Sequence, residues 1–179
     1  MNSSKHLKKS AFFRRALFST TGKILLAAII LISVLANLFT FLTPVVKYYG
    51  TGMAPTLEDG QILVVSKVGK IKNGDIIAFY YNNKVLVRRV IATENQQISI
   101  DLYGQVSING EPLEEPYIEN KTLGQCNQKF PLNVPVGSYF VMGDHREAAM
   151  DSRLEEIGTV DEDRLIGKVL FSLHPMRGV

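Results

Sequence analysis

The feature that most constrains this chain is an apolar segment, residues 24–42 (ILLAAIILISVLANLFTFL), which contains no charged side chain. A helix of this length extends roughly 28 Å, enough to cross the hydrocarbon core of a bilayer. Basic residues are concentrated before it, because residues 1–23 carry six lysines and arginines and no acidic residue. The positive-inside rule then predicts that residues 1–23 lie in the cytoplasm and that the chain after the segment faces outward.

A cleavable signal peptide is the alternative interpretation of this N-terminal region. The apolar core is longer than that of an ordinary signal peptide, and no small-x-small cleavage site follows within residues 43–49. We therefore predict a single-pass protein of the plasma membrane, with the lipid bilayer as one partner. It would have a basic cytoplasmic leader (1–23), a transmembrane helix (24–42) and an extracytoplasmic domain (45–179).

The outer domain has the pattern of a mainly β fold. Short runs rich in β-branched and aromatic residues are bounded by glycine and asparagine, and helical periodicity is nearly absent. We expect strands at residues 61–66, 75–81, 84–91, 97–100, 105–108, 138–142 and 166–173. The pairs Asn82-Asn83 and Asn109-Gly110 tolerate left-handed backbone and predict tight turns. Residues 111–128 are polar, contain two prolines and predict a surface excursion.

Composition excludes several functional classes. The net charge is +3, but beyond residue 23 the chain carries 14 bases and 17 acids, which argues against a nucleic-acid partner. Cys126 is the single cysteine, so no disulfide can form within the chain. The three histidines, His6, His145 and His174, are far apart, and no cluster has the spacing of metal ligands. We expect neither a metal nor a cofactor.

Three motifs follow the apolar segment in order. They are GTGMAPTL at residues 50–57, GDII at 74–77 followed by VRRVI at 87–91, and MGDHREAAMDSR at 142–153. Together they resemble the sequence boxes of type I signal peptidases, the Ser/Lys peptidases of family S26, and the resemblance extends over roughly residues 20–173. It implies a signal-peptidase-I-like β-barrel or sandwich domain of the catalytic type, carried on one N-terminal transmembrane helix.

The resemblance also assigns roles to three positions, and none of them carries the family residue. The nucleophilic serine falls at Gly52, the general-base lysine at Arg88, and the hydroxyl partner of that lysine at Ala149. A guanidinium stays protonated in proteins, so Arg88 cannot accept the proton of a nucleophile. Thr51 is a nearby hydroxyl, but in an extended segment it would point away from the face of position 52. Lys84 lies beside a predicted turn, where solvation keeps a lysine charged.

The third motif contains the residue types of a catalytic triad, namely His145, Asp151 and Ser152. Asp151 and Ser152 are adjacent, however, and a triad is defined by geometry that neighbours in sequence rarely provide. We therefore favour a structural role, in which the charged residues of the motif form ion pairs that order a loop beside the groove. These residues are Asp144, Arg146, Asp151 and Arg153.

From these positions we predict that the protein is not an enzyme but a pseudo-peptidase that binds a secreted precursor. The peptide would add to the exposed edge of the strand at 75–81. The groove residues are expected to be Met53, Pro55, Ile76, Ile77, Ala78 and Phe79. The pattern resembles the signal-peptidase-like proteins of Gram-positive pilus gene clusters, which implies a pilin-like precursor, or the pilin with its sortase, as partner. Two alternatives stay open: an active type I signal peptidase with a non-standard catalytic site, and an engineered knockout of an ordinary enzyme.

Overall fold

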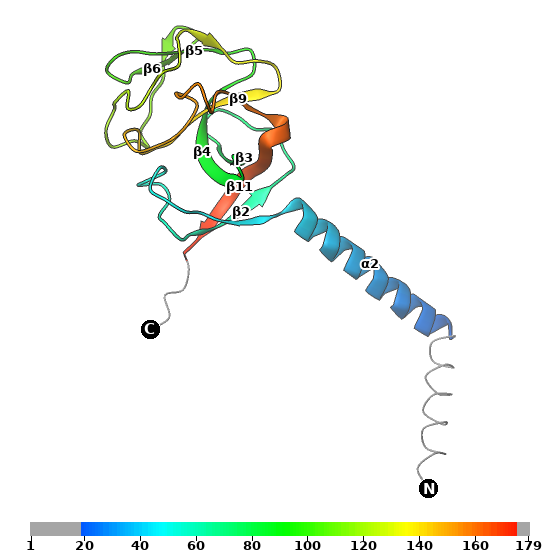
Figure 1. The fold of residues 1–179 in the computed structure, drawn as a ribbon. Helices are drawn as coiled ribbons and strands as arrows, with labels where there is room; N and C mark the ends of the chain where they lie inside the picture. The colour runs from blue at the N-terminus through cyan, green and yellow to red at the C-terminus, as the bar shows by residue number, and fades with distance from the viewer. Residues whose placement is uncertain (1–18, 175–179) are drawn as a thin grey trace, which may run out of the picture. The chain divides into compact units, whose positions relative to one another are not determined.

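The structure is a computed structural model that describes residues 19–174 (Figure 1). Its internal contacts divide the chain into two units, Met1–Leu42 and Thr43–Val179, and each is described by itself. The predicted basic leader lies outside the described residues apart from residues 19–23.

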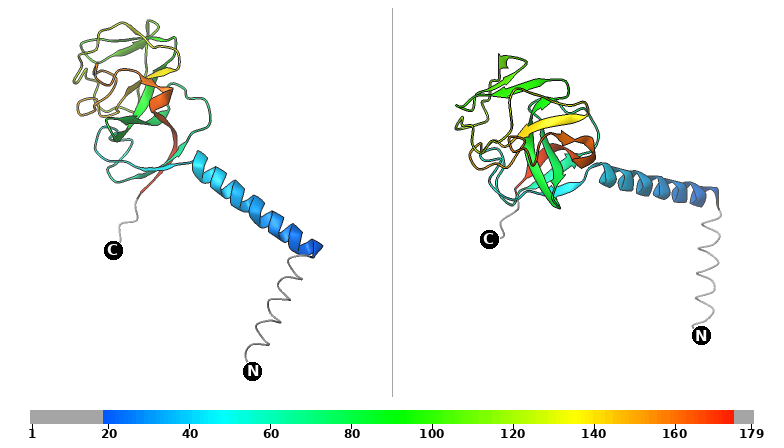
Figure 2. Two further views of the ribbon diagram at one scale, coloured as in Figure 1. Left: turned by 45° about the vertical axis from the view of Figure 1, so that its right-hand side comes forward. Right: turned by 45° about the horizontal axis from the view of Figure 1, so that its top comes forward.

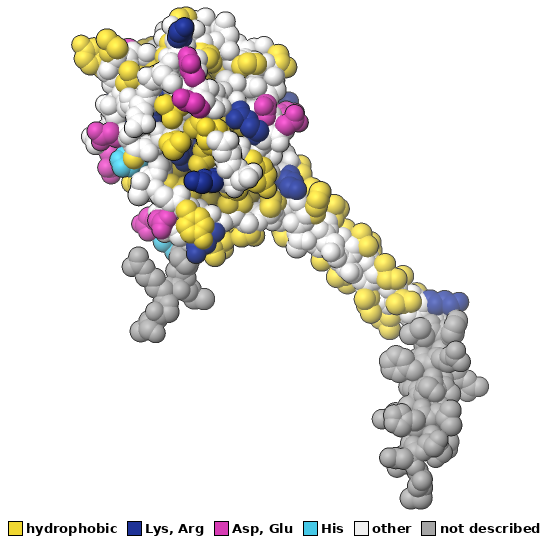
Figure 3. All heavy atoms as spheres, in the orientation of Figure 1, with side chains coloured by type: hydrophobic (Ala, Val, Ile, Leu, Met, Phe, Trp, Pro, Cys, Tyr) yellow, Lys and Arg dark blue, Asp and Glu magenta, His cyan; other side chains and the backbone are white. Residues whose placement is uncertain are grey.

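The first unit contains helix α2 (Thr20–Leu42), which has 23 residues and no buried side chain. Ser19 precedes it, and its hydroxyl accepts a hydrogen bond from the N–H of Gly22 at 3.1 Å, as in an N-cap. Within the helix, Asn37 and Thr40 donate to backbone carbonyls at 2.8 and 2.9 Å, so their side-chain donors are satisfied inside the helix. Its visible face is covered largely by hydrophobic side chains (Figure 3). By length and composition, α2 can cross a membrane.

The second unit is built on a seven-stranded sheet. Its strands are β1 (Val45–Lys47), β2 (Ile62–Ser66), β3 (Ile76–Tyr81), β4 (Lys84–Thr93), β9 (Ser138–Met142), β10 (Val160–Asp161) and β11 (Leu165–Leu173). They pair antiparallel in the order β1-β2-β11-β3-β4-β9-β10. A short 3-10 helix, η1 (Glu162–Arg164), joins the last two strands in sequence.

A smaller sheet lies at one end of this unit, beyond β9 (Figures 1 and 2). Its strands are β5 (Gln97–Ile100), β6 (Val106–Ile108), β7 (Glu111–Pro112) and β8 (Leu132–Asn133), in the order β7-β6-β5-β8. The prediction of a mainly β domain preceded by an apolar helix is confirmed. Neither sheet closes on itself, so the domain is not a complete barrel.

The seven predicted strands correspond to β2, β3, β4, β5, β6, β9 and β11, and β5 and β9 have the predicted bounds. The remaining strands have only two or three residues, too few to produce an alternating pattern. Both predicted turns use left-handed backbone, with φ of 45° and 61° at Asn82 and Asn83, and 52° and 86° at Asn109 and Gly110. Local turn chemistry therefore determines these two hairpins.

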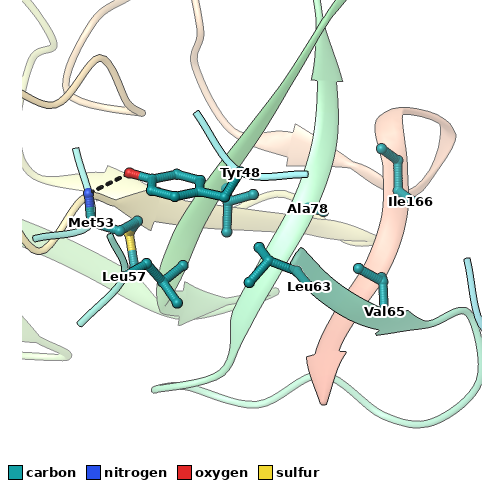
Figure 4. Close-up of a cluster of buried hydrophobic side chains, with 8 residues drawn as sticks. Tyr48, Met53, Leu57, Leu63, Val65, Ala78 and Ile166 are labelled. Atoms are coloured by element: carbon teal, nitrogen blue, oxygen red, sulfur yellow. Dashed lines mark hydrogen bonds between the residues drawn. The ribbon is translucent and has the colours of Figure 1, made fainter. Parts of the chain in front are cut away.

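Hydrophobic side chains cover both faces of the large sheet near its centre. On one face, Tyr48, Met53 and Leu57 from the loop before β2 pack against Leu63 and Val65 (Figure 4). This cluster fixes the loop that contains the first motif onto the sheet. Another cluster fills the space where β4 and β9 meet the smaller sheet. Its buried members are Ile91, Ala92, Ile98, Ile100, Val106, Val134, Phe140 and Met142.

Strand β3 lies in the middle of the large sheet and is enclosed. Ala78 belongs to the cluster of Figure 4, whereas its neighbours Ile77 and Phe79 belong to a cluster on the opposite face. Strand β4 pairs along one edge, and β11 pairs along the other between Ile77 and Phe79. The expectation that residues 75–81 offer an exposed edge to a peptide is therefore wrong, because β11, distant in sequence, occupies that edge.

Gly167 lies where the register of β11 shifts against β3, and it generates a stability prediction. Its φ is +148°, and a Cβ there would lie 2.1 Å from the carbonyl oxygen of Ser66. Gly69 also has a left-handed φ, +114°, but open space around its would-be Cβ. We expect Gly69→Ala to cost about 1–3 kcal/mol from backbone strain. We expect Gly167→Ala to cost a further ~1–3 kcal/mol from overpacking.

Urea unfolding of the full chain in detergent micelles, followed by tyrosine fluorescence, measures both losses. The chain has no tryptophan, so the signal comes from its seven tyrosines. Equal losses for the two variants would show that the contact with Ser66 contributes nothing.

Candidate functional site

Gly52 lies in a turn between β1 and β2, not in an extended segment. The N–H of Ala54 donates to the carbonyl of Thr51 at 3.0 Å. The Tyr48 hydroxyl accepts from the N–H of Met53 at 2.9 Å and holds the turn on the core (Figure 4). Strand alternation therefore does not separate Thr51 from position 52, and both residues line the same cavity.

The segment that follows β9 holds this turn from a second side. The N–H of His145 donates to the carbonyl of Gly52 at 3.2 Å, and Nδ1 of the His145 ring lies 3.3 Å from the carbonyl oxygen of Thr51. Gly143 permits this approach, because a Cβ there would lie 2.3 Å from both the Gly52 oxygen and the Ala149 Cβ. The first and third motifs are therefore in direct backbone contact.

Arg88 reaches from β4 to position 52. A Cβ placed on Gly52 would lie only 3.0 Å from Nη2 of the guanidinium. Nε donates to the carbonyl of Met150 at 2.9 Å, and Nη1 donates to the carbonyl of Val87 at 2.6 Å. Arg88 is 6% exposed, and burial lowers its pKa because desolvation disfavours the charged form. The guanidinium therefore borders the volume that a side chain at position 52 would need.

A cavity of about 170 Å³ opens beside Gly52 and Arg88. It adjoins a larger, mostly apolar groove of about 650 Å³, and the two hollows share Tyr49, Val85 and Leu86. The cleft is thus formed by the first half of β4 and the turn that carries the first motif.

The first half of β4 also has an open edge. Residues 84–88 pair with β3 along one side, but the register with β9 begins only at Arg89, opposite Met142. Among the described strands, none pairs with the other side of residues 84–88, and four of these five residues line the small cavity. An extended peptide can therefore pair with backbone groups here while its side chains enter the cleft.

Buried ion pairs order the segments around the cleft. No member has a side chain more than 11% exposed, and the pairs are Asp144–Arg89, Glu115–Arg146 and Asp151–Arg153. Only the last lies wholly within the third motif, and its N–O distance is 2.8 Å. The other two connect this motif to β4 and to the polar excursion. The third motif is thus ordered by ion pairs, and two of the partners, Arg89 and Glu115, lie outside it.

Asp144 connects three parts of the chain. It accepts from Nε of Arg89 at 2.8 Å and from the hydroxyl of Thr56. Arg89 also donates to the carbonyl of Gly74 at 2.9 Å and lies 4.0 Å from the centre of the Tyr117 ring. Burial by itself would lower the pKa of Arg89, but the hydrogen bond and charge of Asp144 outweigh it and raise that pKa.

Glu115 and Tyr117 also belong to the site, although the polar composition of residues 111–128 predicted only a surface excursion. Glu115 is 4% exposed, and the Tyr117 hydroxyl donates to it at 3.0 Å. Burial raises the pKa of Tyr117, and the neighbouring carboxylate raises it further. The run Glu115-Pro116-Tyr117, in which a carboxylate and an aromatic hydroxyl flank a proline, is the local sequence signal for this contact.

The predicted groove residues do not share one accessible surface. Pro55 is exposed but lines a separate depression, and half-buried Ile76 borders another. The other predicted groove residues have no accessible surface, and they are Met53, Ile77, Ala78 and Phe79. They belong to the core beneath the cleft, because β3 is covered on both faces. Tyr49, Val85 and Leu86 line the cleft in their place.

The structure does not bring His145, Asp151 and Ser152 together as a triad. The Ser152 hydroxyl is buried and accepts from the N–H of Val141 at 3.0 Å, whereas His145 lies against Thr51. Asp151 accepts instead from Arg153 and from the N–H of Gly143. The exposed position of Lys84 agrees with its interpretation as a surface lysine.

Comparison with known proteins identifies the family of the chain. Residues 20–174 match the family described as signal peptidase, peptidase S26. The chain belongs to the signal peptidase I family. A signal peptidase I of Bacillus licheniformis is 33% identical over 188 residues, which cover 96% of this chain and 96% of that protein. One of Bacillus amyloliquefaciens is 36% identical, covering 87% of this chain and 86% of that protein.

A solved signal peptidase I from Enterococcus faecalis is 28% identical, with a TM-score of 0.48. It covers 57% of this chain and 98% of its own length. The family prediction is therefore confirmed by the family match and the Bacillus relatives. The apolar helix α2 suggests a membrane anchor.

These relatives contradict the prediction that the chain is not an enzyme. Both Bacillus proteins are named signal peptidase I, which is an enzyme, and the identity extends over most of this chain. The prediction relied on three aligned positions, Gly52, Arg88 and Ala149. Catalytic groups are recognised by geometry and not by sequence position, so those positions do not test whether other groups serve the same cleft. The pseudo-peptidase assignment is therefore wrong.

The Glu115–Arg146 pair generates a prediction about buried charge. Arg146→Met leaves the Glu115 carboxylate buried without its cation, so we expect a loss of about 3–5 kcal/mol in the free energy of unfolding. Adding Glu115→Gln removes the charge but keeps an oxygen that can accept from Tyr117, and should recover most of the loss. Urea unfolding of both variants measures this difference. An Arg146→Met variant as stable as the unmodified chain would contradict the assigned role of the pair.

Proposed function

We propose that this protein is a membrane-anchored signal peptidase that cleaves exported precursor proteins through a non-standard catalytic site. The observation that carries the proposal is the cleft beside the open edge of residues 84–88, next to the turn at Thr51 and Gly52. Relatives named signal peptidase I, aligned over most of the chain, support the reaction class.

The charge distribution supports a topology for this enzyme. Residues 1–23 contain six basic residues, which favour a cytoplasmic N-terminus. The second unit would then face outward, in the compartment where exported precursors emerge. Cleavage would take place on the outer side of the plasma membrane.

The shape of the cleft supports an extended substrate with small and apolar side chains. Backbone groups of the substrate would pair with the open edge of β4. The cavity of about 170 Å³ at Gly52 and the adjoining, mostly apolar groove of about 650 Å³ would receive successive side chains of the substrate. The scissile bond would lie beside the turn at Thr51.

For the chemistry, we propose Thr51 as nucleophile and His145 as general base. Thr51 lines the cavity, and His145, which lines the neighbouring depression beside Pro55, has its ring Nδ1 3.3 Å from the backbone carbonyl oxygen of Thr51. The Thr51 hydroxyl would attack the scissile carbonyl carbon while the imidazole takes its proton. That proton would pass to the leaving amine as the peptide bond breaks. Water would then hydrolyse the acyl ester and regenerate the threonine.

Cleavage of a purified preprotein by the full chain in detergent micelles tests this proposal. Thr51→Val removes the hydroxyl at nearly constant shape and should reduce kcat/KM by at least about 100-fold, whereas Thr51→Ser should retain cleavage. His145→Gln should lower kcat in the same way.

A positive control is the double variant Gly52→Ser with Arg88→Lys, which carries the family residues at both positions. If that variant cleaves the preprotein and the unmodified chain does not, the proposed function is overturned. Full cleavage by Thr51→Val would overturn the role of Thr51 alone.

For the substrate we propose a pilin-like precursor, supported by the resemblance to signal-peptidase-like proteins of pilus gene clusters. A competition between a pilin-like precursor and an ordinary secreted preprotein tests this choice, with and without the sortase. We expect kcat/KM to favour the pilin-like precursor. Equal values would show that the enzyme is a general signal peptidase.

A further inference from the structure

One buried arginine beside the cleft has no ion-pair partner of its own. Three of the four arginines there pair with the three buried carboxylates, as described above. Arg88 is the fourth, and within residues 19–174 no carboxylate lies within ion-pair distance of it. The charges of Asp151 and Asp144 act on Arg88 from beyond ion-pair distance, but burial outweighs them and lowers its pKa, so an anion that reaches the guanidinium directly would stabilise it.

The guanidinium presents one nitrogen to the cavity. Nε and Nη1 of Arg88 are used by the carbonyls of Met150 and Val87, whereas no hydrogen bond of Nη2 is found in the described part of the chain. Nη2 is the atom closest to the space above Gly52, and Arg88 lines the cavity there. Its two N–H groups can donate to the oxygens of an anion in that space.

The surroundings determine which anion fits. The cavity holds about 170 Å³ and is continuous with the open edge of residues 84–88. Ala148, Val85 and Leu86 contribute apolar side chains to its walls, and Tyr48, Thr51 and Arg88 contribute polar ones. A small planar anion at the end of an extended peptide satisfies both conditions, since the peptide pairs with β4 and its end reaches Arg88.

We infer that the cavity beside Gly52 is a binding site for the C-terminal carboxylate of a peptide, held by Nη2 of Arg88. The inference deepens the proposed function, because cleavage of a precursor releases a peptide with such a carboxylate in this cleft. Retention of that product would compete with the next precursor. Binding itself requires no catalysis, so it can be measured separately.

Isothermal titration of the full chain in detergent micelles tests the site. The probes are the acid acetyl-Ala-Leu-Ala-OH and its C-terminal amide, which differ only in the carboxylate. Because a charge-assisted hydrogen bond replaces a neutral one, we expect the acid to bind at least about tenfold more tightly. Equal affinity of acid and amide, or no binding of the acid at millimolar concentration, would overturn the inference.

Two variants locate the site. Arg88→Gln should abolish the preference for the acid. Because this change also affects the bonds to Met150 and Val87, Gly52→Val provides a second route: it keeps Arg88 but fills the space in front of Nη2. Gly52→Val should therefore also remove the preference for the acid. A preference that survives in either variant would contradict the inference.

Lys84→Gln is the matched control for charge, because Lys84 is an exposed cation on the same edge: the change can alter the affinity of acid and amide alike, whereas only the group that holds the carboxylate alters their ratio. It should leave the preference unchanged, and a loss there would assign the carboxylate to Lys84 and overturn the role of Arg88. Failure of the preprotein assay together with a retained preference for the acid would reject the proposed catalysis alone. Cleavage without that preference would reject only the carboxylate site.

Discussion

Buried pairing of carboxylates with guanidinium groups is the interaction on which the cleft depends. The chain between β9 and β10 has almost no regular secondary structure, so backbone ladders cannot fix its position. Asp151 does so instead, because it binds Arg153 and accepts the N–H of Gly143 at 2.9 Å. Asp144 then fixes the same segment to Arg89 on β4. Loss of one partner would leave the other charge buried and uncompensated, and this would destabilise the fold.

The pairing also determines how closely the turn at Gly52 and the third motif approach each other. Gly143 has no room for a Cβ, and its position is fixed by Asp151. The turn at Gly52 is therefore held at backbone contact distance from the third motif. Gly52 itself does not have a left-handed φ, so its backbone conformation would permit a side chain. What limits a larger residue at position 52 is the guanidinium of Arg88.

The sequence predicts the fold well because its signals are local. Alternating hydrophobicity marks the longer strands, and Asn82-Asn83 and Asn109-Gly110 determine their turns through left-handed backbone. The groove was placed incorrectly because β11, far away in sequence, covers one edge of β3, and only sheet order reveals this. Likewise, the burial of Glu115 inside a polar segment depends on a distant cation, Arg146.

The site also shows why Gly52 and Arg88 have to be considered together. A lysine at position 88 would carry all its donors on one nitrogen, whereas Arg88 donates from two nitrogens of a planar group, Nε to the carbonyl of Met150 and Nη1 to that of Val87. One of those bonds secures the wall of the cavity at Met150. Arginine at this position therefore supplies structure as well as charge, and the guanidinium that holds the wall also limits the space at position 52. The shape of the cleft and its excess positive charge consequently have the same origin.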